Sequence, residues 1–121
     1  IDWTGRDREE VVKVGHAAAV LLLQDPPVRV TPAAIERHLG RRGWLRHRRS
    51  KLPLANAALD GHEEALASFQ RRRLQWAATA LLASGDDPTP WRALRIAGLR
   101  SEWLAEAAAL LATTPSASAF I

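Results

Sequence analysis

The sequence predicts an all-α protein with two tandem helix-turn-helix units linked by a long helix. Ala and Leu dominate the apolar residues, which make up 47% of the 121 residues, whereas Val and Ile are few. Ala and Leu lose little conformational freedom on entering a helix, so this composition favours helices over strands. Threonine–proline pairs and glycines interrupt the apolar segments where helices are expected to begin and end. We therefore expect separately capped helices and no sheet.

The first expected helix begins near Thr4, a candidate N-cap, and runs to about Gln24. The prolines of Asp25-Pro26-Pro27 stop it, because they cannot continue the hydrogen-bond ladder. Apolar residues recur at helical spacing and predict a buried face, formed by Val11, Val14, Ala18, Leu21 and Leu22.

A helix-turn-helix outline follows this helix. Thr31 is placed to cap a short helix that begins at Pro32 and ends at Gly40, which suits the left-handed conformation. A second short helix is expected over residues 44–50. A capped short helix, a glycine-containing turn and another short helix are typical of DNA-binding helix-turn-helix units.

The next segments predict a short helix over 54–59 and a long helix over 63–84. The threonine–proline pair and the glycine of the first half then recur 58 residues later, as Thr89-Pro90 and Gly98. They bracket a short helix over 91–97, and Ser101 is placed to cap another that runs to about residue 112. This recurrence predicts an internal duplication, with units over 1–52 and 53–114 and a tail over 115–121.

Positive charge is concentrated in the first expected unit. The chain carries 17 Lys and Arg against 13 Asp and Glu, a net charge of +4. Seven basic residues and no acidic one lie between residues 37 and 51, together with His38 and His47. Such a block attracts a polyanion, of which nucleic acid is the commonest, although a solvated basic face without a partner remains an alternative. The seven are Arg37, Arg41, Arg42, Arg46, Arg48, Arg49 and Lys51.

No residue set for catalysis is visible, and we expect neither an enzyme nor a cofactor. There is no cysteine, so disulfides and thiolate metal sites are excluded. His62-Glu63-Glu64 starts like a zinc protease motif, but Leu66 stands where the second histidine is required.

The apolar run at 17–23 is too short to cross a bilayer, and no signal peptide is visible, so a cytoplasmic location is expected. A start at Ile1 and the lack of Met predict a fragment of a larger protein.

Double-stranded DNA is the predicted ligand. At spacings of four and three on a helix, Arg42, Arg46 and Arg49 share a face, and we expect that face to enter the major groove. The side chains beside that face would meet phosphates, namely Arg41, His47, Arg48 and Lys51. The cap residues Thr31 and Thr89 either bind phosphate or only cap their helices. In the second unit the candidate DNA contacts are Arg92, Arg95, Arg100 and Ser101, and this unit is alternatively a scaffold. Four tryptophans are expected in the core, namely Trp44, Trp76, Trp91 and Trp103.

The order and spacing of several motifs resemble the C-terminal region of TnsD, a family of target-site selectors of cut-and-paste transposons. The resemblance covers roughly residues 1–100. The sequence departs from the family pattern at two positions. Ala55 stands where threonine is expected, and Arg49 stands where an apolar residue is usual. The matching segments are Ile1-Asp2-Trp3, Arg6-Asp7, VRVTPAAIERHLGRRGWL at 28–45, KLP at 51–53, Phe69, Arg72-Arg73-Leu74, Trp76-Ala77-Ala78 and PTPWRALRIAGLR at 88–100.

The resemblance implies sequence-specific recognition of a DNA attachment site and recruitment of the transposon's AAA+ ATPase regulator by the full-length protein. It also implies a bacterial protein with a TniQ-like, zinc-binding N-terminal region, to which nothing in this chain corresponds. Tandem units in one chain predict a monomer on an asymmetric site. Two alternatives remain: a dimeric helix-turn-helix transcription regulator, and a helical interaction module whose basic face binds an acidic protein.

Overall fold

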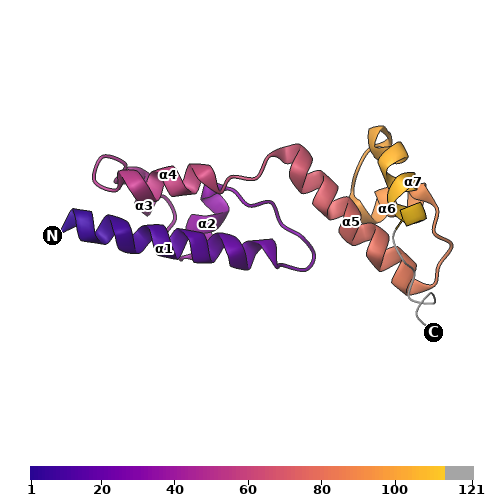
Figure 1. Cartoon of the computed structure of the whole chain (residues 1–121), viewed down its shortest axis with the longest axis horizontal. Helices are drawn as coiled ribbons and strands as arrows, with labels where there is room; N and C mark the ends of the chain where they lie inside the picture. The colour runs from indigo at the N-terminus through magenta and orange to yellow at the C-terminus, as the bar shows by residue number, and fades with distance from the viewer. Residues whose placement is uncertain (114–121) are drawn as a thin grey trace. The chain divides into compact units, whose positions relative to one another are not determined.

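The computed structural model describes residues 1–113, and all of the regular structure in that range is helical (Figure 1). The all-α prediction is confirmed. The chain divides into two compact units, of which the first ends at Leu66 and the second begins at Ala67. The sequence predicted the division after residue 52, whereas α4 (Pro53–Gly61) packs against α1 (Trp3–Leu22) in the first unit. The predicted tail over 115–121 lies outside the described residues.

The first unit holds four helices around one core. Besides α1 and α4 these are α2 (Pro32–His38) and α3 (Trp44–His47), which follow each other between the two longer helices in the chain (Figure 1). Leu22 was expected in the core, but it is 49% exposed at the last turn of α1. The buried apolar residues of this unit are Val14, Ala17, Ala18, Leu21, Val30, Ile35, Leu45, Leu52, Ala55 and Leu59.

Two aspartates fix the ends of helices in the first unit. Asp2, rather than Thr4, caps α1, because its Oδ1 accepts a hydrogen bond from the backbone N–H of Gly5 at 3.1 Å. Asp7 lies on α1 but caps α4, where its two carboxylate oxygens accept from the N–H groups of Leu54 and Ala55 at 2.9 and 2.8 Å. Since Asp7 is 3% exposed, these charge-assisted bonds tie α4 firmly to α1.

The second unit has the same order of elements. It comprises α5 (Leu66–Ser84), α6 (Pro90–Ala97), the 3₁₀ helix η1 (Ser101–Trp103) and α7 (Leu104–Thr113). Ser101 was expected to cap an α-helix, but it opens η1, and α7 begins only after Trp103. The buried residues of α5 have the spacing of those of α1: Leu74, Ala77, Ala78 and Leu81 against Val14, Ala17, Ala18 and Leu21.

The threonine caps and the glycine turns of both units are formed as predicted. The hydroxyl oxygens of Thr31 and Thr89 accept from the N–H groups three residues onward, at 3.1 and 3.4 Å. Gly40 and Gly98 have φ values of 70° and 71°, which glycine adopts at no steric cost. None of the helices over residues 1–113 has the length and apolar character that crossing a membrane requires.

Trp91 is the main exception among the predicted core residues. Its side chain is 57% exposed in the first turn of α6. The core-facing side of that helix is formed by Ala93, Leu94 and Ala97, and Trp91 lies outside this set. Trp103 is buried, whereas Trp44 and Trp76 are partly buried against the cores of their units.

Candidate nucleic-acid interface

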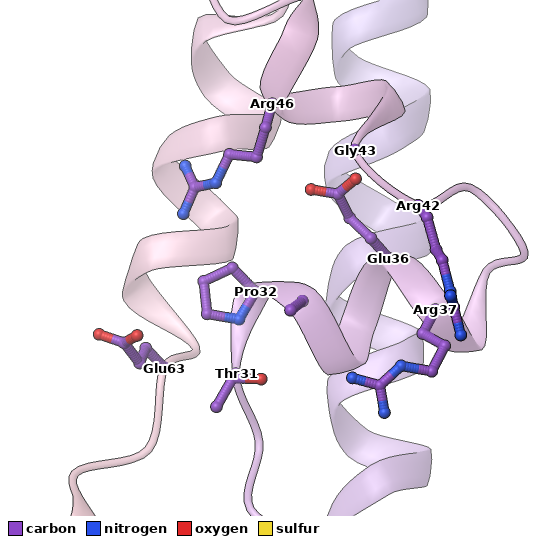
Figure 2. Close-up of a pocket in the computed structure, with 9 residues that line it drawn as sticks. Thr31, Pro32, Glu36, Arg37, Arg42, Gly43, Arg46 and Glu63 are labelled. Atoms are coloured by element: carbon purple, nitrogen blue, oxygen red, sulfur yellow. The ribbon is translucent and has the colours of Figure 1, made fainter.

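A groove of about 750 Å³ lies in the first unit between α2, the turn that follows it, and α3 (Figure 2). Three of its side chains are arginines and two are glutamates, so the lining carries more positive than negative charge. Thr31, Arg42 and Arg46 were predicted as site residues, and the groove brings these three together. The nine lining residues are Thr31, Pro32, Ala33, Glu36, Arg37, Arg42, Gly43, Arg46 and Glu63.

The turn between α2 and α3 sets the position of Arg42. Gly43 has a φ of 72°, and a Cβ on it would meet the His47 ring at 3.1 Å, so glycine is required at this point. The N–H of Arg41 donates to the backbone oxygen of Glu36 at 2.8 Å and closes the end of α2. Arg42 is thereby left exposed at the edge of the groove.

Arg37 and Arg42 are the two arginines of this groove without an internal partner. Both are exposed, and neither side chain forms a hydrogen bond or an ion pair with any residue in the described range 1–113. In Figure 2 both side chains extend from the part of the chain around the end of α2. Their guanidinium groups are available to an anionic ligand.

The predicted helix over 44–50 is much shorter in the structure. α3 ends at His47, because the chain turns there to place Leu52 in the core and to let Pro53 open α4. The Arg48 guanidinium donates to the backbone oxygen of Trp44 at 3.1 Å across this short helix. Arg42 precedes α3 and Arg49 follows it, so the prediction that Arg42, Arg46 and Arg49 share one helical face is wrong.

Arg46 lines the groove but is held from the other side by α4. One guanidinium nitrogen donates to Asn56 Oδ1 at 3.3 Å, and another is bonded and ion-paired to Asp60. The hydrogen bond from Arg46 lowers the pKa of the Asp60 carboxyl below its usual range. Asn56 also donates to the backbone oxygens of Leu45 and Leu52, and so fixes α3 to α4.

A second basic cluster surrounds Trp44 in the same unit. The guanidinium carbons of Arg48, Arg6 and Arg41 lie 4.5, 5.1 and 5.2 Å from the centre of its ring. Arg41 and Arg6 also donate to Oε1 of the buried Glu10. Burial by itself raises the pKa of Glu10, but Arg41, with help from Lys13 and Arg6, outweighs it and brings that pKa below the ordinary value.

The remaining predicted residues of the first unit lie at the surface. His47 and Arg49 are exposed. The Lys51 ammonium is 5.5 Å from the centre of the Trp3 ring, a cation–π contact that leaves the charge accessible. None of these three side chains lines the groove.

The second unit has a smaller hollow of about 370 Å³, lined by Arg92, Arg95 and three other residues. Arg92 donates to the backbone oxygen of Asp87 at 3.4 Å. Arg100 and Ser101 are exposed outside this hollow, and Thr89 serves as the cap of α6. Among residues 1–113 no three His, Asp or Glu side chains are grouped so that they could hold a metal ion.

Glu36, Arg37 and Glu63 line the groove but were not among the predicted site residues. A signal for Glu36 was present in the sequence. It lies next to the buried Ile35 and three residues before Leu39, which packs against the same core. A charged residue at such a position indicates a buried polar group that needs a partner.

The structure thus defines an all-helical chain whose first unit carries an arginine-lined groove. Residues 1–59 match the model of the TnsD family, described as Tn7-like transposition protein D. The predicted resemblance to that family is therefore confirmed over these residues, which include α1, α2 and α3, and it connects this part of the chain with transposition. No curated protein and no solved structure matches the chain.

Proposed function

We propose that the first unit binds double-stranded DNA across the surface formed by α2, the following turn and α3, and that this binding selects a target site for transposition. The observation that carries the proposal is the pair Arg37 and Arg42. Both guanidinium groups are exposed on one groove and have no partner within residues 1–113. Arg41, Arg46 and Arg48 all have internal partners, so the two free groups have no evident role in the fold.

The other basic side chains have supporting roles in this proposal. Guanidinium groups stacked on a ring keep N–H groups at their edges, so Arg41 and Arg48 would contact phosphates beside the groove. His47, Arg49 and Lys51 would add positive charge along the same unit. In the second unit, Thr89, Arg92, Arg95, Arg100 and Ser101 would extend the contact along the duplex.

The family resemblance supports the wider setting. We propose a monomer that acts on an asymmetric site in the bacterial cytoplasm, with the AAA+ ATPase regulator as the partner of the full-length protein. Tandem units in one chain, similar in the order of their helices, suit a DNA site without two-fold symmetry.

The test is a titration of the chain with labelled duplex DNA, first with sequences selected from a random pool and then over a range of salt concentrations. We expect a selected sequence, binding near physiological salt, and a log–log salt slope that reports several phosphate contacts. Arg42→Glu should weaken binding about tenfold or more. Because Arg42 is exposed in a turn, this change should leave the fold intact.

Arg8→Glu is the matched control. Arg8 is exposed on α1 and does not line the groove, so the change in net charge is the same while the groove stays unaltered. It should weaken binding much less than Arg42→Glu. Equal losses in both variants would mean that DNA is bound elsewhere, and failure of the unmodified chain to bind duplex DNA would refute the proposal.

A further inference from the structure

Glu36 has an environment that the fold alone does not explain. Its side chain belongs to α2, is 3% exposed, and forms no hydrogen bond or ion pair with any residue in the described range. Its Oε2 atom is fully buried. Burying a carboxylate without a partner costs several kcal/mol, so such groups are seldom retained without a use.

The second unit shows that the helix does not require this carboxylate. Counted from Thr31 and Thr89, the position of Glu36 in α2 is that of Leu94 in α6, and both residues are buried. The preceding residues, Ile35 and Ala93, are buried in both units as well. A leucine fills this position in one unit, so the glutamate of the other is not needed for packing.

The side chain of Glu36 is directed at the groove. Figure 2 shows its carboxylate extending from α2 into the space between α2 and α3. The same groove is lined by Arg37, Arg42 and Arg46, but none of these arginines forms a hydrogen bond or an ion pair with the Glu36 carboxylate. The groove therefore presents an unused acceptor beside unused arginine donors, and a ligand that fits it carries both a donor and acceptors.

We infer that Glu36 accepts a hydrogen bond from the exocyclic amino group of a cytosine in the bound DNA. The inference rests on the proposed function. Because Oε2 is buried, Oε1 would be the accepting atom. In the major groove, cytosine presents only its N4 amino donor, whereas guanine presents two acceptors, which a carboxylate repels.

The arginines complete the recognition of that base pair. The guanine paired with the cytosine presents N7 and O6, the pair of acceptors that arginine binds best. Arg42, exposed and without a partner on the same groove, is placed to donate to them. A carboxylate and an arginine together read a C·G pair in one orientation, because reversing the pair would bring like groups face to face.

The test compares sequences selected from a random duplex pool by the full 121-residue chain and by Glu36→Gln. The unmodified chain should select a site with a fixed C·G pair. Glutamine prefers the N6 and N7 atoms of adenine, so the variant should select A·T at that position or lose the preference there. Glu9→Gln is the control, because Glu9 is an exposed carboxylate on α1 that does not line the groove, and its loss should change no base preference.

A second measurement uses the unmodified protein and so does not depend on the folding of a variant. N4-methylcytosine, which pairs with guanine through its remaining amino hydrogen, replaces the selected cytosine and puts a methyl group in the major groove. Affinity should fall about tenfold, and the same modification outside the selected site should have no effect.

The outcomes separate the two claims. Selection of one and the same site by the unmodified chain and by Glu36→Gln, or unchanged binding of the methylated site, overturns the cytosine contact and leaves the proposed function standing. If the unmodified chain selects no sequence at all, both are overturned.

Discussion

The two units share an order of helices and differ in what they bury. Four polar or charged side chains are buried in the first unit: Asp7, Glu10, Glu36 and Asn56. In the described part of the second unit, residues 67–113, every buried residue is apolar. The second unit therefore shows that an Ala, Leu and Trp interior suffices for this helical arrangement, and that the buried polar groups of the first unit serve additional purposes.

Three of those four groups organise the surface that we assign to DNA. Asp7 fixes the start of α4, and Asn56 on α4 binds the backbone of α3 and the side chain of Arg46. Glu10 holds Arg41 beside Trp44. Buried hydrogen bonds of this kind fix side chains in one arrangement, which is what a binding surface requires. Glu36 is the one left without a partner.

The largest effect is expected when the buried residues of the two units are exchanged. Leu94→Glu places an unpartnered carboxyl in an apolar core and should destabilise the second unit by about 4 kcal/mol. Glu36→Leu copies the second unit into the first and should leave stability within about 1 kcal/mol of the unmodified chain, or raise it, because an unpaired buried charge is removed. Urea denaturation, with hydrogen exchange to assign the loss to a unit, measures both.

A marked loss of stability in Glu36→Leu would show that the first unit needs the carboxylate for its own fold. The two units would then differ in the interactions that stabilise their helices, and not only in the types of residue that they bury.

An intermediate effect is expected for Glu10→Gln, and it should depend on pH. The pKa of Glu10 is below its ordinary value of 4.5, so the ionised form is stabilised by folding. Its contribution is present above pH 4.5 and is lost as the pH falls through the lower pKa of the folded state. At pH 7 the variant should be less stable by about 2 kcal/mol, and the difference should shrink below pH 4.5.

The control for this prediction is Glu9→Gln, which changes the exposed neighbour on α1. It should alter stability little at any pH. A difference between Glu10→Gln and the unmodified chain that stays constant from pH 7 to 3 would contradict the assigned role of Glu10. Chemical denaturation at a series of pH values provides the measurement.

The sequence predicted several features that depend on local chemistry, although it missed Asp2 as the cap of α1. The caps at Thr31 and Thr89 and the turns at Gly40 and Gly98 were read correctly, because each depends on a few adjacent residues. The all-α class followed from Ala and Leu content for the same reason. The sequence showed where the arginine cluster lies, but it did not show which of these arginines bind other residues of the protein.

Errors arose where distant residues decide the outcome. α3 ends early because Leu52 packs in a core that α1 helps to form. Asp7 caps a helix that begins 46 residues later, which no local pattern reveals. Arg46 was expected in a DNA groove, but Asp60 and Asn56, on a helix that had been assigned to the other unit, bind it. Register and partner choice depend on tertiary packing, and local propensity does not encode them.

The smallest effect is expected for Trp91→Ala in the second unit. Trp91 takes the place in α6 that Ala33 has in α2, and in both units this position is exposed. Since 57% of its side chain is in contact with solvent, its removal should cost no more than about 0.5 kcal/mol in chemical denaturation. Trp103→Ala, at a buried position of the same unit, should cost about 4 kcal/mol and serves as the control. A loss above 2 kcal/mol for Trp91→Ala would place this side chain in the core, as was expected from the sequence. The exposed first turn would then not be a feature that α6 shares with α2.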